Sequence, residues 1–199
     1  LDAIERLSGD YVFLTVAYNP NKKVSSVTDQ FGRRLQFAYD ANGMLNTLTL
    51  PAGNVIRYEY AHPAGIAAQA TERQNLVKVI REDLKTRLYH YEDKNPDTTP
   101  RNVYLLTGIT DEKGIRFATY AYDDRARVIS SEHANGAGRV TLNYTKRSGE
   151  SYNWSITKVT QPLGEVITYD MDATSFRKPT SIEDSRGNFL ISYDPTTQW

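Results

Sequence analysis

The chain has 199 residues, with 24 basic and 24 acidic side chains, so its formal net charge at neutral pH is zero. Nucleic-acid binding depends on clustered cations, and a chain with this balance is not expected to bind nucleic acid. The absence of cysteine excludes a disulfide framework, a thiolate nucleophile and a cysteine zinc site. No apolar run approaches the roughly 20 residues of a transmembrane helix, so no membrane span is expected.

The composition predicts a thin structure. Hydrophobic residues make up 39% of the chain, which is modest for a folded domain. A chain of this length can bury about 70% of its extended surface, which is compatible with one domain or with two small ones. Because the strand pattern resumes after residues 61–75 and 92–102, we expect a single repeat region over residues 1–199. The first residues, LDAIERLSGD, do not follow the order of a signal peptide. Because the first residue is not methionine, we expect a piece of a longer protein.

Internal repetition dominates the sequence and decides the architecture. A glycine within a polar turn is followed by a strand-length run that ends on a tyrosine. The pairs are Gly32 and Tyr39, Gly53 and Tyr60, Gly114 and Tyr122, Gly138 and Tyr144, Gly164 and Tyr169, and Gly187 and Tyr193. The segment VKVIREDLKTRLYHYED keeps the tyrosines of this pattern and replaces the turn glycine.

Alternation along the runs predicts antiparallel strands with one apolar face. Residues two apart share a face of a strand, which groups Leu35 and Phe37 with Tyr39. The same spacing groups residues 56, 58 and 60, residues 140, 142 and 144, and residues 189, 191 and 193. We therefore expect an all-β fold of repeated antiparallel hairpins that form a curved sheet.

The turns between the runs carry their own geometric signal. An aspartate that begins a type I turn can accept backbone hydrogen bonds, and a glycine three residues later adopts the left-handed conformation of a bulged hairpin. Four aspartate–glycine pairs have this spacing: Asp29 and Gly32, Asp40 and Gly43, Asp111 and Gly114, and Asp184 and Gly187. Irregular loops are expected near residues 61–75 and 92–102, and residues 64–75 fit a weak helix or an extended loop about equally well.

The repeated tyrosine–aspartate dipeptides resemble the Rhs or YD-repeat family. The dipeptides are Tyr39–Asp40, Tyr122–Asp123, Tyr169–Asp170 and Tyr193–Asp194, at intervals near twenty residues or multiples of it. The run from residue 89 to 144, which begins YHYEDKNPDTTPRNVYLLTGITDEKG, is similar to the stretch typical of bacterial Rhs proteins. Related repeats occur in insecticidal toxin complexes and in teneurins.

The resemblance implies a structural role within a larger protein. In that family, the repeats form a β-sheet strip that spirals into a hollow cocoon around a C-terminal toxin or effector domain, often delivered by type VI secretion in bacterial competition. The resemblance implies a segment of such a shell, made in the bacterial cytoplasm and then secreted. Its partners would be the rest of the shell, the enclosed toxin and the secretion machinery, with self-association through edge strands as a further expectation. The family's self-cleaving core motif is absent, so only a share in encapsulation is implied.

Other functions find weaker support in the residues. The tyrosines could stack on sugars, and a carbohydrate- or protein-binding module at a cell surface is the alternative, but their fixed places in a repeat favour packing between strands. His62, His90 and His133 lie too far apart for a local metal-ligand pattern. The acidic pairs fit no calcium loop, and the serines lack a nucleophile elbow. We therefore expect no enzyme activity, no cofactor and no metal site.

Overall fold

The computed structural model describes residues 3–4, 14–63, 74–92, 102–145, 156–171 and 179–191, and the structural statements below concern these residues. They form sixteen β-strands and two short 3₁₀ turns. The strands are β1 (Ala3–Ile4), β2 (Leu14–Tyr18), β3 (Val24–Asp29), β4 (Arg34–Tyr39), β5 (Leu45–Thr49), β6 (Val55–Ala61), β7 (Asn75–Ile80), β8 (Thr86–His90), β9 (Gly108–Thr110), β10 (Arg116–Tyr122), β11 (Val128–His133), β12 (Val140–Thr145), β13 (Ile156–Thr160), β14 (Val166–Met171), β15 (Pro179–Asp184) and β16 (Gly187–Leu190); the turns are η1 (Asn102–Tyr104) and η2 (Ala134–Gly136).

The strand order follows the chain. Each strand of the sheet lies beside the strands that precede and follow it in the sequence, and the strand pairs with a defined register are antiparallel. Such an order arises when every connection is a hairpin, since a hairpin places each strand next to its predecessor. The expected fold class of repeated antiparallel hairpins is therefore confirmed.

The chain divides into two compact units. The first consists of Leu1–Tyr91 with Ile109–Ile115, and the second of Glu92–Gly108 with Arg116–Trp199. Both units consist of the same kind of antiparallel ladder. The division into two units does not test whether residues 1–199 form a single repeat region, which stays a prediction. The irregular segments expected near 61–75 and 92–102, and the helix considered for 64–75, fall largely outside the described residues.

Each unit has one apolar and one polar face. In the first unit, Phe37 pairs with Leu48, which pairs with Ile56, so that aliphatic and aromatic side chains form rows across the strands. The opposite face carries rows such as Ser26, Gln36 and Thr49. In β4 the apolar-face side chains are half-buried and the alternate ones exposed, as the alternation predicts.

The second unit repeats this division. Leu142 pairs with Val159, and Val159 with Ile167, on the face that also carries Tyr144 and Tyr169. On the other face, Lys158, Thr168 and Glu183 stand in one row.

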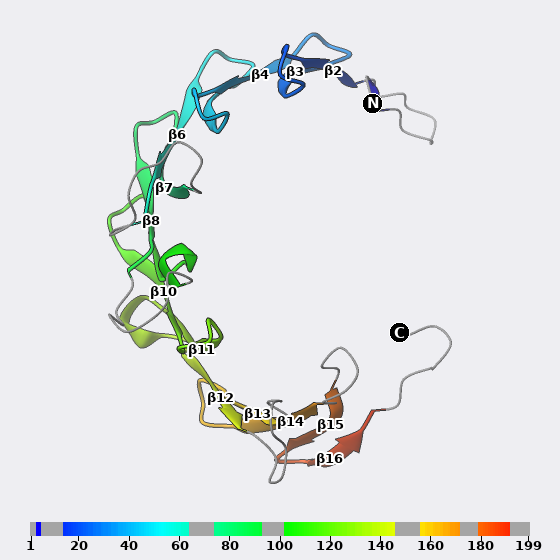
Figure 1. Cartoon of the computed structure of the whole chain (residues 1–199), viewed down its shortest axis with the longest axis vertical. Helices are drawn as coiled ribbons and strands as arrows, with labels where there is room; N and C mark the ends of the chain where they lie inside the picture. Colours follow the sequence, from blue (N-terminus) through cyan, green and yellow to red (C-terminus); the bar gives the residue numbers. More distant parts are fainter. Residues whose placement is uncertain are drawn as a thin grey trace. The chain divides into compact units, whose positions relative to one another are not determined.

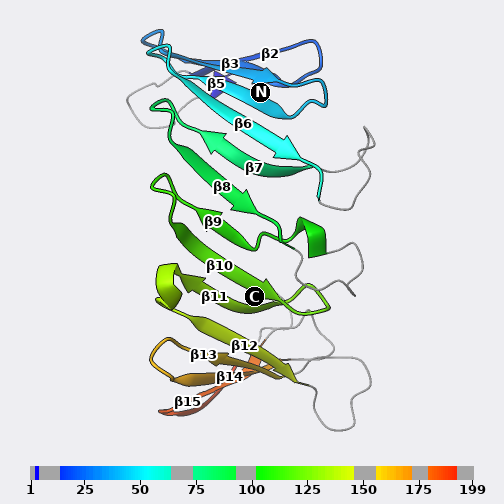
Figure 2. The same ribbon diagram turned by 90° about the vertical axis from the view of Figure 1, so that its left-hand side faces the viewer.

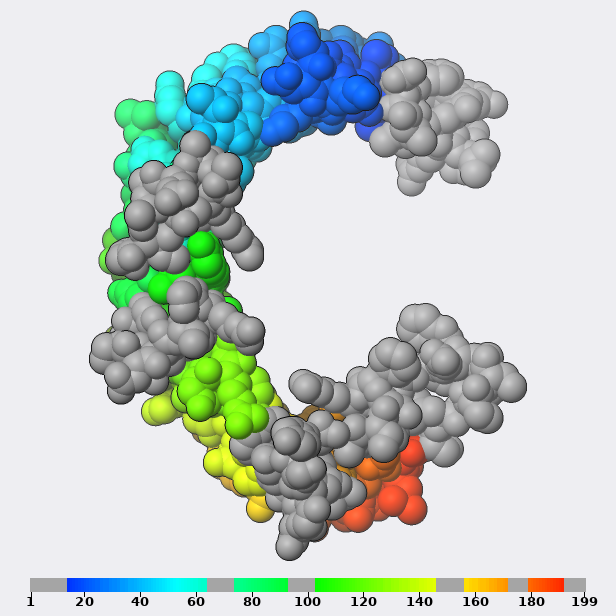
Figure 3. Space-filling view, in the orientation of Figure 1, coloured from blue at the N-terminus to red at the C-terminus, as the bar shows by residue number. Residues whose placement is uncertain are grey.

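Neither unit has a thick core. Among the described residues, Ala118 is the single fully buried hydrophobic side chain, at 2% exposure, while the others of the apolar face are partly covered by neighbours on the same face. The described strands form one layer, with β2 to β6 edge to edge in the first unit and β10 to β12 in the second (Figures 1 and 3). Stability in a single layer depends on ladders and cross-strand pairs rather than on two packed layers.

No helix of the described part of the chain is long and apolar enough to span a membrane.

Candidate functional site

The recurring feature of the molecule is a five-residue turn that closes most hairpins. The amide of the first residue donates to the carbonyl of the fifth, and the amide of the fourth donates to the carbonyl of the first. In the described part of the chain, eight turns share this pattern, beginning at Asn19, Asp29, Asp40, Leu50, Arg81, Asp111, Asp123 and Gln161. We call this arrangement the hairpin-turn motif and number its positions 1 to 5.

An aspartate or asparagine at position 1 adds two further hydrogen bonds. In the turn at Asp40, the side-chain Oδ1 accepts from the amides of Asn42 at 2.9 Å and Met44 at 2.8 Å. The turns at Asp29, Asp111 and Asp123 repeat both bonds, and Asn19 makes the same pair at 3.0 Å. In the YD dipeptides at Asp40 and Asp123, the aspartate is thus a turn-organising group whose carboxylate is already occupied by backbone donors.

Two of these aspartates also pair with an arginine at position 5. Asp29 accepts from Arg33 Nε at 2.6 Å, and Asp123 accepts from Arg127 Nε at 2.7 Å. Burial works to raise the pKa of Asp123, but the hydrogen bonds from the side chain and amide of Arg127 and the amide of Arg125 outweigh it, so the pKa lies below its ordinary value. Asp29 is shifted in the same direction by the same combination. Both carboxylates stay ionised and paired at neutral pH.

Position 4 of the motif always has positive φ. Glycine supplies it at Gly32, Gly43, Gly53, Gly114 and Gly164, with φ between 77° and 89°. Lys22, Leu84 and Ala126 occupy the same position with φ of 60°, 64° and 63°. An alignment on glycine misses these three turns, although the Asn19 and Asp123 that begin two of them could have revealed them. Leu84 lies in VKVIREDLKTRLYHYED, the segment in which the sequence has another residue in place of the turn glycine.

The turn at Asp184 differs from the expected bulged hairpin. Asp184 pairs directly with Gly187 across a two-residue loop, and Gly187 has a φ of 140°. The Asp184 carboxylate instead holds the amide of Arg186 at 2.8 Å and its guanidinium at 2.5 Å. The aspartate–glycine spacing alone did not distinguish these two hairpins, because both are compatible with a glycine at the fourth residue.

Gly138 follows a different connection, in which Asn135, Gly136 and Gly138 all have positive φ between β11 and β12.

The strand-end tyrosines mark β-bulges. Where β2 pairs with β3, Ala17 lies opposite Ser26 but Tyr18 lies opposite Val24, so Ser25 is an extra residue. Equivalent register shifts occur at Tyr39, Tyr60 and Tyr122. The shift at Tyr60 precedes a much longer connection than the five-residue turns, so the bulge does not depend on loop length. Tyr144 pairs with Thr157 without a shift, and between β14 and β15 the shift lies at Met171. Sequence reasoning missed the bulges, although each one interrupts the alternation of the partner strand: Val24 and Val27, for example, lie on the same face but are three residues apart.

Three of these tyrosines donate their hydroxyl group to a backbone carbonyl about sixteen residues earlier. Tyr39 bonds Val24 at 2.8 Å, Tyr122 bonds Leu106 at 2.9 Å, and Tyr144 bonds Val128 at 2.8 Å. Burial raises the pKa of Tyr122 and Tyr144, which keeps both hydroxyl groups protonated as donors. The tyrosines therefore fasten neighbouring strands through both ring and hydroxyl.

The remaining residues of the sequence pattern are placed as follows. Tyr169 lies in β14 between Thr157 and Ile182, on the apolar face. The carbonyl of Asp170 accepts from the Thr180 hydroxyl at 3.1 Å. Burial, with a smaller contribution from Tyr58, raises the pKa of Tyr60. Tyr193 and Asp194 lie outside the described residues.

Acidic side chains of the sheet surface face arginines. Glu112, at position 2 of its turn, accepts from Arg81 at 2.7 Å and from Arg87 at 3.0 Å. Hydrogen bonds from Arg81, from its own backbone and from Arg87 lower the pKa of Glu112 to about 2. In the second unit, Glu92 accepts from Arg116 at 2.9 Å. Carboxylates held in this way are poor candidates for general acids.

The histidines each have a separate environment. His62 lies 3.0 Å from the Gln74 amide nitrogen, His90 lies 2.7 Å from the Thr110 hydroxyl, and the ring of His133 lies 5.2 Å from that of Phe117. Across the described ranges, no group of three histidine or carboxylate side chains gathers as metal ligands would. The alternatives of a metal site or an acid–base pair gain no support from this geometry.

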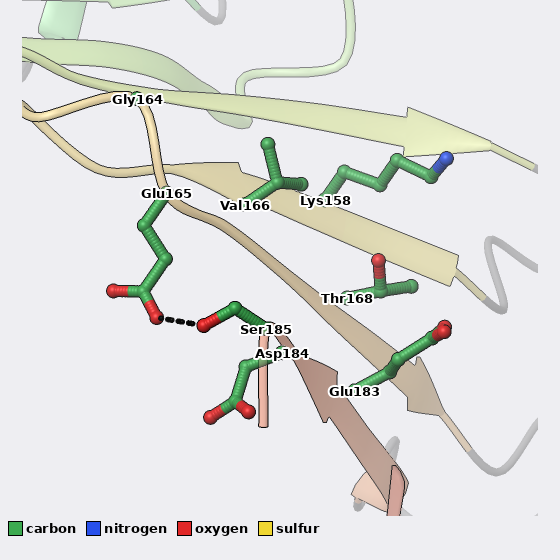
Figure 4. A pocket seen from close by; sticks show the side chains of 8 residues that line it. All are labelled: Lys158, Gly164, Glu165, Val166, Thr168, Glu183, Asp184 and Ser185. Atoms are coloured by element: carbon green, nitrogen blue, oxygen red, sulfur yellow. Dashed lines mark hydrogen bonds between the residues drawn. The ribbon is translucent and has the colours of Figure 1, made fainter. Parts of the chain in front are cut away.

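An open polar hollow lies on the polar face of the second unit. Lys158, Thr168 and Glu183 form its floor, and the Ser185 hydroxyl lies 3.4 Å from the Glu165 carboxylate at its margin. Figure 4 shows the Lys158 ammonium and the Glu165 carboxylate extending in opposite directions. Among the side chains drawn there, the charged groups do not converge on one point, as a ligand site would require.

Comparison with known families identifies the repeat. Residues 18–55, which span the strand-end tyrosines Tyr18 and Tyr39 and four hairpin turns, match the model of the RHS Repeat family. This segment is similar to an Rhs repeat. The resemblance inferred from the tyrosine–aspartate series is therefore confirmed.

Solved Rhs-type structures share the fold over nearly the whole chain. The crystal structure of TcdB2-TccC3 without its hypervariable C-terminal region matches with a TM-score of 0.56 and 17% identity over 96% of this chain. The crystal structure of TcdB2-TccC3-TEV matches with a TM-score of 0.53 and 17% identity over 92%. The chain spans about 10% of the length of each of those chains. A search of curated protein sequences gave no match.

Proposed function

We propose that this chain is a structural, non-enzymatic segment of an Rhs-repeat shell that encapsulates a C-terminal toxin or effector domain in a longer parent protein. The observation that carries the proposal is the repeated hairpin: the same turn, bulge and tyrosine recur in a sheet whose strand order is the chain order. The Rhs-repeat match at residues 18–55 and the fold shared with TcdB2-TccC3 support it.

The mechanism would be confinement by a continuous wall. Strands in a sheet lie about 4.8 Å apart and are joined by backbone hydrogen bonds, so the gaps between them are far too small for a polypeptide. A single layer leaves both faces free, and the two faces differ: one carries rows such as Phe37, Leu48 and Ile56, and the other rows such as Ser26, Gln36 and Thr49. In a curved wall, one of these faces would meet the cargo and the other would meet solvent.

The polar groups of the repeat have structural partners, which supports a non-enzymatic role. The turn aspartates are occupied by backbone amides, as in the two bonds of Asp111, and Glu112 is held by two arginines. An acid or base in catalysis needs a pKa near the operating pH, whereas the pKa of Glu112 is about 2.

Partners of the segment would be the adjoining shell and the enclosed domain. Phe31, Leu84 and Leu163 project from hairpin turns with 73%, 73% and 99% of their surface exposed. Contact with other parts of a larger assembly would cover such side chains, and unpaired edge strands would favour the same association. We further propose that the parent is made in the bacterial cytoplasm and exported, for example by type VI secretion in bacterial competition.

The test uses the longer protein that contains this segment. Limited proteolysis of the intact parent should leave its C-terminal domain uncut while that domain is enclosed. A paired variant, Gly43→Val with Gly53→Val, should open the wall and make the C-terminal domain sensitive to protease. A C-terminal domain cut equally fast in the wild-type parent and after separate expression would overturn encapsulation.

A second measurement addresses the binding-module alternative. The 199-residue chain, applied to a glycan array, should bind no sugar above background. Saturable binding to one glycan class, lost when the residues of the polar hollow are replaced, would favour a carbohydrate-binding module instead.

A further inference from the structure

Two of the three tyrosine hydroxyl bonds, those of Tyr39 and Tyr144, fall on the same backbone position beside a bulge. Val24 is the residue directly before the bulge residue Ser25, and it lies opposite Tyr18. Val128 is the residue directly before the skipped Ile129, and it lies opposite Tyr122. Tyr39 and Tyr144, each one strand further along, donate to the carbonyls of these two valines. Two hairpins in different units thus use one arrangement.

A bulge interrupts the regular ladder, so nearby backbone groups need other partners. Without the bulge, the pairing of Ala17 with Ser26 would continue as Tyr18 opposite Ser25. The connection would then be one residue longer, and the five-residue turn that begins at Asn19 could not close. The observed register and this unbulged alternative differ in the residue that pairs with Tyr18, which is Val24 in the first and Ser25 in the second. Tyr39 bonds the carbonyl of Val24.

A cation covers the ring of Tyr39 and that of Tyr144. Lys23 Nζ lies 5.1 Å from the ring centroid of Tyr39, and the Arg127 guanidinium lies 4.3 Å from that of Tyr144. Both cations occupy position 5 of the preceding turn, directly before the valine whose carbonyl is bonded. Lys23 also donates to the carbonyl of Gly43 in the following turn. The turn therefore supplies a group that holds the ring over the bulge.

We propose that the strand-end tyrosines act as positioning residues that select the bulged register of the preceding hairpin, with the position-5 cation orienting the ring. Each of these two tyrosines lies two strands away from the bulge's own tyrosine and bonds a carbonyl of the strand between them, so the register of one hairpin is stabilised by the next strand. If a strand slips by one residue, its apolar side chains move to the polar face of the sheet and its polar side chains to the apolar face. Correct register is therefore important for a sheet built from repeats. The inference does not depend on what the sheet encloses.

The test is Tyr144→Phe in the 199-residue chain, which keeps the ring and removes the hydroxyl. Amide hydrogen exchange by NMR should become about fivefold faster at Val128, Ile129 and Ser130, the change expected from losing one hydrogen bond. Cross-strand nuclear Overhauser contacts between Tyr122 and Val128 should weaken, with new contacts between Tyr122 and Ile129. Exchange in the turn at Asp111–Gly114 should not change.

Tyr120→Phe is the matched control, because Tyr120 lies on the same face, opposite Ser131 in the regular part of the ladder that precedes the register shift. It should leave exchange at 128–130 unchanged. Tyr39→Phe should reproduce the local effect at Val24, Ser25 and Ser26 in the other unit. Three results would overturn the proposal. They are faster exchange spread evenly through the sheet, the same local increase in Tyr120→Phe, and no local increase in either Tyr39→Phe or Tyr144→Phe.

Discussion

The turns at Asp111 and Asp123 have nearly the same hydrogen bonds and different residues at the strained position. Asp111 accepts from the amides of positions 3 and 5 at 2.9 and 3.0 Å, and Asp123 accepts from its equivalents at 3.0 and 2.9 Å. Position 4 is Gly114 with a φ of 78° in one turn and Ala126 with a φ of 63° in the other. The hydrogen bonds of the turn therefore impose the left-handed conformation, and glycine lowers its cost without being required for it.

The largest expected effect comes from placing a branched side chain at position 4. Gly43→Val should destabilise the chain by about 3 kcal/mol, because a β-branched residue at a φ of 77° is strongly strained and its Cβ would meet Lys23 Nζ. Urea unfolding followed by circular dichroism measures the change. Gly43→Asn is the control, since asparagine tolerates this conformation, and it should lose less than half as much. Equal losses in the two variants would contradict a conformational cause.

A smaller effect is expected at position 1. Asp40→Ala removes two acceptor bonds to the amides of Asn42 and Met44 and should cost about 1–2 kcal/mol. Asp40→Asn should keep most of the stability, because Asn19 makes the same two bonds in its own turn. If the asparagine variant were as unstable as the alanine variant, charge rather than hydrogen-bond acceptance would organise the turn. Thermal unfolding of both variants gives the comparison.

The two position-4 residues can be exchanged directly. Ala126→Gly should stabilise the chain by about 0.5–1 kcal/mol, since relief of the left-handed strain exceeds the conformational entropy that glycine loses. Gly114→Ala should destabilise by a similar amount, because no atom lies within 4 Å of the added Cβ and only the backbone conformation is penalised. Denaturant midpoints of both variants test the pair. A stabilising Gly114→Ala would show that the two turns are not equivalent.

The smallest expected effect is on the stability of the chain at low pH. The pKa of Glu112 is lowered from 4.5 to about 2 by hydrogen bonds from Arg81, from its own backbone and from Arg87, so its stabilising contribution is present above pH 4.5 and is lost as the pH falls toward 2. Unfolding midpoints should therefore decline over this range. In Glu112→Gln the decline should be shallower, with the remainder arising from carboxyls such as Asp123, whose pKa is also lowered. An unchanged acid profile in Glu112→Gln would contradict the assignment. Exposure to solvent and salt keeps the effect modest.

Much of the turn chemistry could be predicted from the sequence, because it is local. The aspartate at position 1 and glycine at position 4 interact within five residues, so the turns at Asp29, Asp40 and Asp111 follow from their spacing. The prediction for Asp184 was wrong in detail because a two-residue loop has the same spacing. The turns at Lys22 and Ala126 were missed because the pattern was aligned on glycine, whereas the segment that contains Leu84 was recognised by its tyrosines.

Less of the structure around the tyrosines could be predicted from the sequence. Their place at strand ends and on the apolar face could be predicted from alternation, as for Leu35, Phe37 and Tyr39. The bulge opposite Tyr18 could not be predicted from the alternation of β2, because its mark lies in the partner strand, where Val24 and Val27 are three residues apart. Nor could the cation over Tyr144, because Arg127 lies seventeen residues earlier and meets the ring through strand pairing.

The sequence by itself determined the all-β fold, the hairpin repeat and the aspartate-centred turns, because period-two alternation and short-range hydrogen bonds are encoded in neighbouring residues. Only the tertiary structure decided the bulged register, the carbonyl that each tyrosine bonds and the pairing of Glu112 with two arginines from an earlier hairpin. These depend on which strands lie side by side, and strand pairing joins residues that the chain order keeps apart.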